Sequence, residues 1–304
     1  MSKSNSMLWM RLFSLFLYFC LVNLTGCVNT NKEQNIAESP SIIEGERFWI
    51  NQYVPTDGKR VFTIENTESG LYRFCCYENK RIIMEKIAED TYEGFYYDTA
   101  RKVFYSYNKE KKQLEILNLE FEPIDILVSD LELFEIKNMV GIGAEIYALI
   151  VPVNPLEKEE ISSDVGEGDY LDFGEQIVAI NPISGEMRQI EMENPICITQ
   201  GEKGLLIYAY QKGEYRLISY DTVKGESSVL EKMNDVGYIF AMAYRDNCFY
   251  YTGNLYPGFW KRDMMTGEDT CLNEEAVIVK DADLYVINNS VYMLDHFGGE
   301  IYRY

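Results

Sequence analysis

Short hydrophobic runs alternate with turn residues along most of the chain from about residue 41 onward. The runs are rich in β-branched and aromatic residues, and almost no stretch keeps the period of an amphipathic helix. Such runs, separated by Gly, Asn and Asp, are typical of antiparallel strands joined by hairpins. The pattern therefore predicts an all-β domain over residues 41–304. Ile124, Leu127, Leu131 and Phe134 have helical spacing and leave a helix open there, although the repeat register favours strands.

One turn recurs along this domain with the form Asx-x-x-x-Gly-Glu, each time between two candidate strands. The Asx side chain caps the turn, and the glycine takes the positive φ that a tight hairpin often requires. The spacings between successive copies are 42, 73, 40, 42 and 32 residues. Complete copies begin at Asn181, Asp221, Asp263 and Asp295, and incomplete copies begin at Asn66 and Asn108.

This spacing predicts a β-propeller. Repeats of about 40 to 45 residues with four strands each are typical of that fold, in which every repeat forms one blade of antiparallel sheet. A single blade cannot bury both of its faces, so a closed ring is required for a continuous core. We expect six blades, and a seventh within the 73-residue interval is the alternative. The predicted blades cover about 41–78, 79–120, 121–193, 194–234, 235–275 and 276–304.

The N-terminal segment has a different pattern. Lys3 and Arg11 give it a positive start, and residues 12–22 are apolar except for Ser14. Small residues follow, which completes the layout of an export signal. The apolar segment is shorter than the ~20 residues that a spanning helix needs. Residues 1–26 are therefore predicted to be a signal peptide.

The end of this signal, Leu-Thr-Gly-Cys at residues 24–27, resembles the processing site of bacterial lipoproteins. The resemblance implies cleavage before Cys27, lipidation of its sulfur, and an extracytoplasmic protein anchored to the membrane at the cell surface or on the periplasmic side. An ordinary secretory signal followed by a cysteine is the alternative. Residues 27–40 are mostly polar and predict a flexible tether between the lipid and the folded domain.

Charge and cysteine content limit the partners and the chemistry. The chain has a net charge of −21, and removal of residues 1–26 takes away two positive charges and no acid, leaving −23. This charge disfavours nucleic acid and anionic lipid headgroups as partners. The cysteines beyond the signal and Cys27 have no C-x-x-C spacing for metal or redox work, and we expect them to be packed as small hydrophobic residues. They are Cys75, Cys76, Cys197, Cys248 and Cys271.

Residues 53–62, Tyr-Val-Pro-Thr-Asp-Gly-Lys-Arg-Val-Phe, resemble the Pro-Asp-Gly-Lys turn and following strand of TolB-like six-bladed propellers, with Thr56 inserted. Members of this broad superfamily occur as bacterial surface lipoproteins. The superfamily includes binding proteins and enzymes, so the resemblance implies an architecture and leaves the activity open.

Candidate catalytic and metal-binding residues are few. The one histidine, His296, lies in the last repeated turn, and a Ser-His-Asp or Cys-His arrangement would have to use it. The acidic insertion 154–175 has oxygen ligands for Ca²⁺ but lacks the ligand positions of an EF-hand loop, so a solvated loop is the favoured interpretation. We therefore expect no cofactor and no metal site. Paired carboxylates can cleave glycans, but the sequence selects no pair.

The most ligand-like segment is residues 254–260, where Tyr256, Phe259 and Trp260 flank a Pro-Gly turn. Such aromatic residues can stack on sugar rings or anchor a protein contact. The favoured alternative is that Phe259 and Trp260 begin a strand and pack between blades. The sequence as a whole predicts a membrane-anchored binding or scaffold module for a glycan, peptide or protein. A carboxylate-dependent carbohydrate hydrolase or lyase is the second hypothesis.

Overall fold

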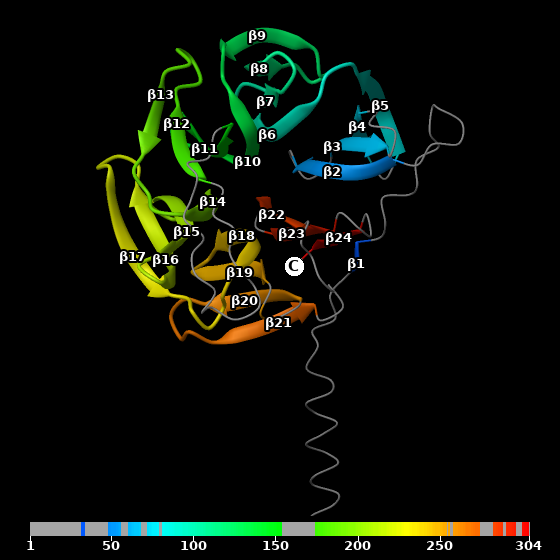
Figure 1. Cartoon of the computed structure of the whole chain (residues 1–304). Coiled ribbons are helices and arrows are strands. Elements are labelled where there is room, and N and C mark those ends of the chain that lie inside the picture. The colour runs from blue at the N-terminus through cyan, green and yellow to red at the C-terminus, as the bar shows by residue number, and fades with distance from the viewer. Residues whose placement is uncertain are drawn as a thin grey trace, which may run out of the picture.

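The computed structural model describes residues 32–33, 48–55, 60–67, 72–78, 81–153, 174–253, 255, 258–273, 282–287, 290–295 and 300–303. In these residues the regular secondary structure is entirely β-strand and forms antiparallel sheets arranged around a central axis (Figure 1). The described residues contain no helix of the length and apolarity needed to cross a membrane. The all-β propeller predicted from the hydrophobic pattern is confirmed.

Five sheets are blades of four consecutive strands, with the first strand of each nearest the axis. Blade 1 consists of β2 (Phe48–Pro55), β3 (Arg60–Thr67), β4 (Tyr72–Glu78) and β5 (Arg81–Ala88). Blade 2 consists of β6 (Tyr92–Asp98), β7 (Val103–Asn108), β8 (Gln113–Leu117) and β9 (Pro123–Val128). Blade 3 consists of β10 (Leu133–Ile142), β11 (Glu145–Pro152), β12 (Gln176–Ile180) and β13 (Met187–Ile190). Blade 4 consists of β14 (Pro195–Gln200), β15 (Gly204–Gln211), β16 (Glu214–Asp221) and β17 (Glu226–Lys232). Blade 5 consists of β18 (Ile239–Arg245), β19 (Cys248–Gly253), β20 (Phe259–Asp263) and β21 (Asp269–Asn273).

The remaining sheet is composite. It has the order β1-β24-β23-β22 and combines β22 (Ala282–Ile287), β23 (Ser290–Asp295) and β24 (Glu300–Arg303) with the two-residue strand β1 (Lys32–Glu33). Lys32 pairs with Tyr302 and Glu33 pairs with Ile301. We call it the closing sheet, because β22 contacts β18 on one side and β2 on the other. The prediction of six blades, each from one continuous repeat, is wrong in its count. The described residues form five such blades, and the last repeat supplies three strands of the closing sheet.

Some predicted boundaries also need correction. The boundary expected after residue 78 is wrong, because β5 pairs with β4 and so belongs to blade 1. Similarly, β9 belongs to blade 2 because it pairs with β8. The helical alternative is wrong, since Ile124 and Leu127 lie in β9 and Phe134 lies in β10. Two residues of the expected tether, Lys32 and Glu33, form β1.

The repeated turns that begin at Asn108, Asn181, Asp221 and Asp263 form as predicted, but the copies occupy two different positions within the blades. Residues 68–71 of the Asn66 copy and 296–299 of the Asp295 copy lie outside the described residues. Turns at Asn181, Asp221 and Asp263 join the third and fourth strands of blades 3, 4 and 5, whereas Asn66 and Asn108 lie where the second strand meets the third. This difference accounts for the unequal spacing, because the interval from Asn108 to Asn181 runs from a second hairpin to a third one. The described part of that interval forms β8 to β12 and no additional sheet, which disfavours a seventh blade there.

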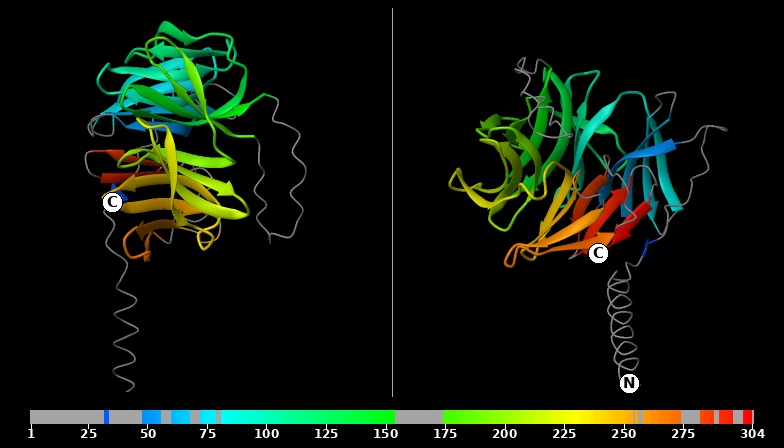
Figure 2. Two further views of the ribbon diagram at one scale, coloured as in Figure 1. Left: turned by 90° about the vertical axis from the view of Figure 1, so that its left-hand side faces the viewer. Right: turned by 60° about the horizontal axis from the view of Figure 1, so that its bottom comes forward.

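The direction of the strands defines two faces of the ring (Figure 2). Antiparallel pairing places the first and third hairpins of each blade at one face and the second hairpin at the other. We call the face at which the innermost strands end, at Asp98, Ile142, Gln200 and Arg245, the mouth face. The opposite face is the far face.

Packing between blades forms the core. Blades 3 and 4, for example, enclose an aliphatic cluster that contains Leu149, Ile177, Ile198 and Ile207, each at most 1% exposed. Comparable clusters lie between the other neighbouring blades and between blade 5 and the closing sheet. Each blade therefore depends on its neighbours for burial, as a radial repeat fold requires.

Candidate functional site

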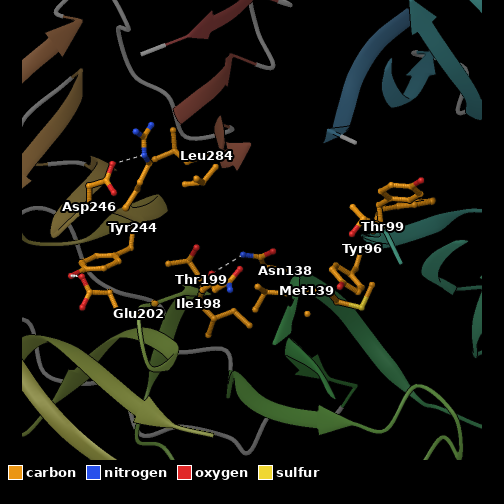
Figure 3. A pocket seen from close by; sticks show the side chains of 18 residues that line it. Tyr96, Thr99, Asn138, Met139, Ile198, Thr199, Glu202, Tyr244, Asp246 and Leu284 are labelled. Atoms are coloured by element: carbon orange, nitrogen blue, oxygen red, sulfur yellow. Dashed lines mark hydrogen bonds and ion pairs between the residues drawn. The ribbon is translucent and has the colours of Figure 1, made fainter. Parts of the chain in front are cut away.

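A hollow of about 580 Å³ opens at the mouth face, on the axis of the ring (Figure 3). Its walls come from the innermost strands β6, β10, β14, β18 and β22 and from the hairpins that follow three of them. Tyr244 and Glu202 stand on one side of the hollow, and Tyr96 and Thr99 lie across from them (Figure 3). The volume lies within the usual range of small-ligand sites, and a propeller axis is a typical place for one.

Tyr96 is positioned by a close approach between two innermost strands. It lies on β6, stacks on Tyr105 with ring centroids 6.0 Å apart, and reaches toward Gly141 of β10. A Cβ at Gly141 would lie 1.9 Å from the Tyr96 phenol oxygen. Glycine at position 141 therefore allows the tyrosine to reach across to blade 3. Burial, together with the nearby Asp98 carboxylate, raises the pKa of Tyr96, so its hydroxyl stays protonated at neutral pH.

Amide and hydroxyl groups line the wall formed by blades 3 and 4. Asn138 Nδ2 donates to the Ile198 carbonyl oxygen at 2.9 Å and so joins β10 to β14. Thr199 and Gln200 follow on β14, where Thr199 is partly exposed and Gln200 is exposed. This wall presents donors and acceptors without a formal charge.

The charged groups of the mouth are paired with neighbours. Tyr244 donates to Asn247 Oδ1 at 3.1 Å and approaches Glu202 Oε1 at 3.5 Å. Burial and the Glu202 carboxylate raise the pKa of Tyr244. Arg245 Nε lies 2.7 Å from Asp246 Oδ2. Both carboxylates of the lining are thus close to a donor within the mouth.

This arrangement suits recognition of a polar, uncharged ligand. Tyrosine rings supply apolar faces, while their hydroxyls and the neighbouring threonines and amides supply hydrogen bonds. Sugars and extended peptides both present such alternating surfaces. Among the residues that the structure describes, no group of three or more His, Cys, Asp or Glu side chains is arranged as a metal site.

The aromatic segment predicted to bind a ligand lies elsewhere. Phe259 and Trp260 begin β20, which starts at the far face of blade 5. Phe259 is 0% exposed and packs against the closing sheet, and Trp260 packs against the cluster between blades 4 and 5. These positions favour the packing interpretation, and ligand contact by the two side chains stays a prediction. Tyr256 lies outside the described residues.

Some of the remaining sequence predictions are supported by the structure, and others concern residues that it does not describe. Cys75, Cys76, Cys197 and Cys248 are buried, as expected for packed residues, and Cys271 is partly buried. Cys27, His296 and residues 154–173 of the acidic insertion lie outside the described residues. Glu175, at the end of that insertion, is buried and pairs with Lys137 Nζ at 2.6 Å.

The mouth residues were not predicted from the sequence. They come from different blades, and none of them forms a local motif with its neighbours. The one sequence signal that could have found them is their shared position near the end of a first strand, as for Thr199 and Tyr244. Using that signal requires the correct blade boundaries.

Comparisons with known proteins support the fold. No family model matches the sequence, and no curated protein matches it. Among solved structures, the chain is similar to one described as "Crystal structure of Nidogen/Laminin Complex", with a TM-score of 0.50 and 10% sequence identity. The similarity covers 76% of this chain and 88% of that chain. In all, 832 solved chains match, and a likeness at this level of identity shows the fold and no activity.

Proposed function

We propose that this protein is a binding module of the bacterial cell envelope, tethered by a lipid on Cys27, which holds a glycan or peptide at the mouth of its propeller. The observation that supports a binding site is the open hollow of about 580 Å³, which five innermost strands line and to which blades 2 to 5 contribute tyrosine, amide and hydroxyl groups. The solved structure of similar fold is a complex of two proteins, which is compatible with a binding or scaffold function.

The position of the site within a closed ring also favours binding. Asn138, Thr199 and Tyr244 lie on strands that neighbouring blades hold in place, so their side chains are pre-oriented before a ligand arrives. Pre-orientation lowers the cost in conformational entropy of fixing these side chains when a ligand binds. The resemblance of residues 53–62 to TolB-like propellers is consistent with this architecture.

The binding site is tested with the purified protein on a glycan array and a peptide library, followed by variants of the mouth. Tyr244→Ala should weaken the best ligand by about 30-fold or more, because an aromatic side chain in the wall of a site contributes strongly to binding. Gln200→Ala should weaken it by about two- to tenfold through one lost hydrogen bond. Gln189→Ala, an exposed glutamine on the outer strand β13, is the matched control and should leave affinity unchanged.

A ligand whose affinity is unchanged by both Tyr244→Ala and Gln200→Ala would contradict this site. Release of a cleaved glycan, abolished by Glu202→Gln or Asp246→Asn, would instead support the carbohydrate hydrolase or lyase. The anchor is tested separately, because Cys27→Ser should move the protein from the membrane fraction to the soluble fraction. Two acyl chains suffice for stable anchoring, so a Cys27→Ser chain that stays membrane-bound would contradict the lipid.

A further inference from the structure

Three hairpin tips expose a large apolar side chain at the same turn position. Ile183, Val223 and Met265 are each the third residue of a repeated turn, and they are 81%, 93% and 84% exposed. They are the most exposed large hydrophobic residues of the part of the chain that the structure describes. Because they belong to blades 3, 4 and 5, the three tips follow one another around one sector of the ring.

The turn geometry explains why these side chains point outward. In each copy the backbone NH of the third residue donates to the Asx side chain, as from Val223 to Asp221 Oδ1 at 3.0 Å and from Met265 to Asp263 Oδ1 at 2.8 Å. The glycine then closes the turn at positive φ, 73° for Gly225 and 74° for Gly267. This fixed backbone leaves the third side chain at the tip of the hairpin. It explains the protrusion but not the choice of an apolar residue.

Blade 2 shows that the third hairpin can keep its apolar residues inside. There Asn118 Oδ1 accepts from the NH groups of Glu120 and Glu122, while Phe121 turns into the core and is 2% exposed. The surface of that hairpin is formed by the two glutamates. Exposed apolar tips are therefore a property of blades 3 to 5 rather than of the hairpin position.

The start of β1 lies on the same face as these tips. The innermost strand β22 ends at the mouth face, and β24 runs parallel to it because each is antiparallel to β23. Since β1 is antiparallel to β24 and Lys32 pairs with Tyr302, β1 begins at the mouth face. Cys27 precedes Lys32 by five residues, which span at most about 18 Å.

We propose that the mouth face lies against the membrane, with Ile183, Val223 and Met265 inserted at the boundary between headgroups and acyl chains. This inference rests on the lipid anchor proposed above, because the short distance from Cys27 keeps this face near the bilayer. Single exposed apolar residues are ordinary, whereas three at equivalent turns, on the face at which the tether enters the fold, suit insertion into a membrane interface. The net charge of −23 that is left without residues 1–26 favours a neutral or zwitterionic surface. The mouth then opens toward the bilayer, and its ligand is a glycan or peptide displayed close to the membrane.

The test places a tryptophan at each tip of the lipidated full chain. The chains Ile183→Trp, Val223→Trp and Met265→Trp are bound to phosphatidylcholine vesicles with brominated acyl chains, which quench inserted tryptophans. Glu110→Trp is the matched control, because Glu110 is the third residue of the Asn108 copy of the turn and lies on the far face. We expect quenching above the wild-type level at the three tips and none at position 110.

The results of this experiment distinguish a failure of the proposed orientation from a failure of the proposed lipid anchor. Lipidated protein that binds the vesicles without quenching at any tip, or with equal quenching at position 110, overturns the orientation and leaves the anchor standing. Absence of lipid on Cys27 by mass spectrometry contradicts the anchor, and the tips are then examined in the Cys27→Ser chain. There, replacing all three tips with Ser should lower vesicle partitioning by at least about tenfold. An unchanged partition coefficient would overturn the inference.

Discussion

The two faces of blade 1 bury different chemistry on the same strands. Toward blade 2, Phe62 and Phe74 join an aromatic cluster in which Phe74 stacks on Phe121 at 4.5 Å. On the opposite face, Glu65 of β3 and Arg73 of β4 are each only 2% exposed. Arg73 Nε donates to Glu65 Oε2 at 2.8 Å, and Arg73 Nη1 donates to Glu85 of β5 at 2.7 Å. Burial is equally deep on both faces.

This difference shows that an alternating pattern does not by itself mean a sheet with one solvated face. The polar face is buried on the side of blade 1 away from blade 2, and the Glu65 carboxylate is fully engaged. Thr63 Oγ1 and the Tyr77 hydroxyl both donate to Glu65 Oε1 at 2.7 Å. The apolar face is held by packing, which tolerates change in shape, whereas the polar face depends on every partner being present.

The largest expected effect comes from removing the buried arginine. Arg73→Met leaves Glu65 buried without its counterion and should lower the free energy of unfolding by about 3–5 kcal/mol. The midpoint of urea unfolding measures the change. Glu65→Gln added to Arg73→Met should recover part of the loss, because the buried charge is then removed.

Arg60→Met is the control for this prediction. The Arg60–Glu78 pair of the same blade is 3.6 Å long with side chains 47% and 38% exposed. Its loss should change stability by less than about 0.5 kcal/mol. Equal effects of the two arginine substitutions would remove the distinction between buried and exposed charge on this blade.

A smaller effect is expected on the apolar face. Phe104 is 0% exposed and lies 5.0 Å from Phe121 and 4.8 Å from Phe62. Phe104→Leu keeps an apolar side chain but removes the ring, and it should lower the unfolding free energy by about 1.5 kcal/mol. A loss as large as that of Arg73→Met, measured in the same urea titration, would show that the aromatic face is no more tolerant than the polar one.

Apart from the Arg60 control, the smallest effect is expected at Asp235, a partner of a second buried arginine whose acidic partners are more exposed. Arg262 is 3% exposed and pairs with Asp235, Asp269 and Glu231, of which Asp235 is 60% exposed. The hydrogen bond from Arg262 lowers the pKa of Asp235 below its ordinary value. The ionised carboxylate therefore contributes stability above about pH 4, and this contribution is lost as the pH falls through the lowered pKa.

Asp235→Asn should accordingly lower stability at pH 7 by less than about 1 kcal/mol, since solvent screens the exposed pair. Its difference from the wild-type chain should shrink at pH 3. Urea midpoints at the two pH values measure this. A difference that is the same at both would show that Asp235 does not act through its charge.

Local features of the fold were predictable from the sequence, and relations between repeats were less so. The turns at Asp221 and Asp263 followed from side-chain capping and a glycine at positive φ, which depend only on neighbouring residues. Blade boundaries were partly wrong because the same turn chemistry suits any hairpin. It therefore marks the second hairpin at Asn108 and the third one at Asn181 alike.

The mouth and the buried hydrogen bonds between Arg73 and Glu65 were not predicted, for a different reason. Tyr96, Asn138 and Tyr244 meet only when separate blades close into a ring, so no local pattern connects them. Glu65 and Arg73 read as the polar side of an alternating strand. Phe259 and Trp260 stood out in the sequence because aromatic residues beside a Pro-Gly turn are conspicuous, yet the same residue types begin a buried strand.

The pairing of β1 with β24 has a consequence for how the chain reaches its final form. The two strands are the first and the last of the described chain, and the cost in chain entropy of bringing such distant segments together slows their meeting. In the export from the N-terminus that we propose, Lys32 and Glu33 cross the membrane long before β24 arrives. Until β24 pairs with β1, this edge of the closing sheet is unpaired and accessible to proteases and to other strands. Pairing of β24 with β1 is thus the step that completes the closing sheet, and it takes place at the point nearest the proposed acyl chains.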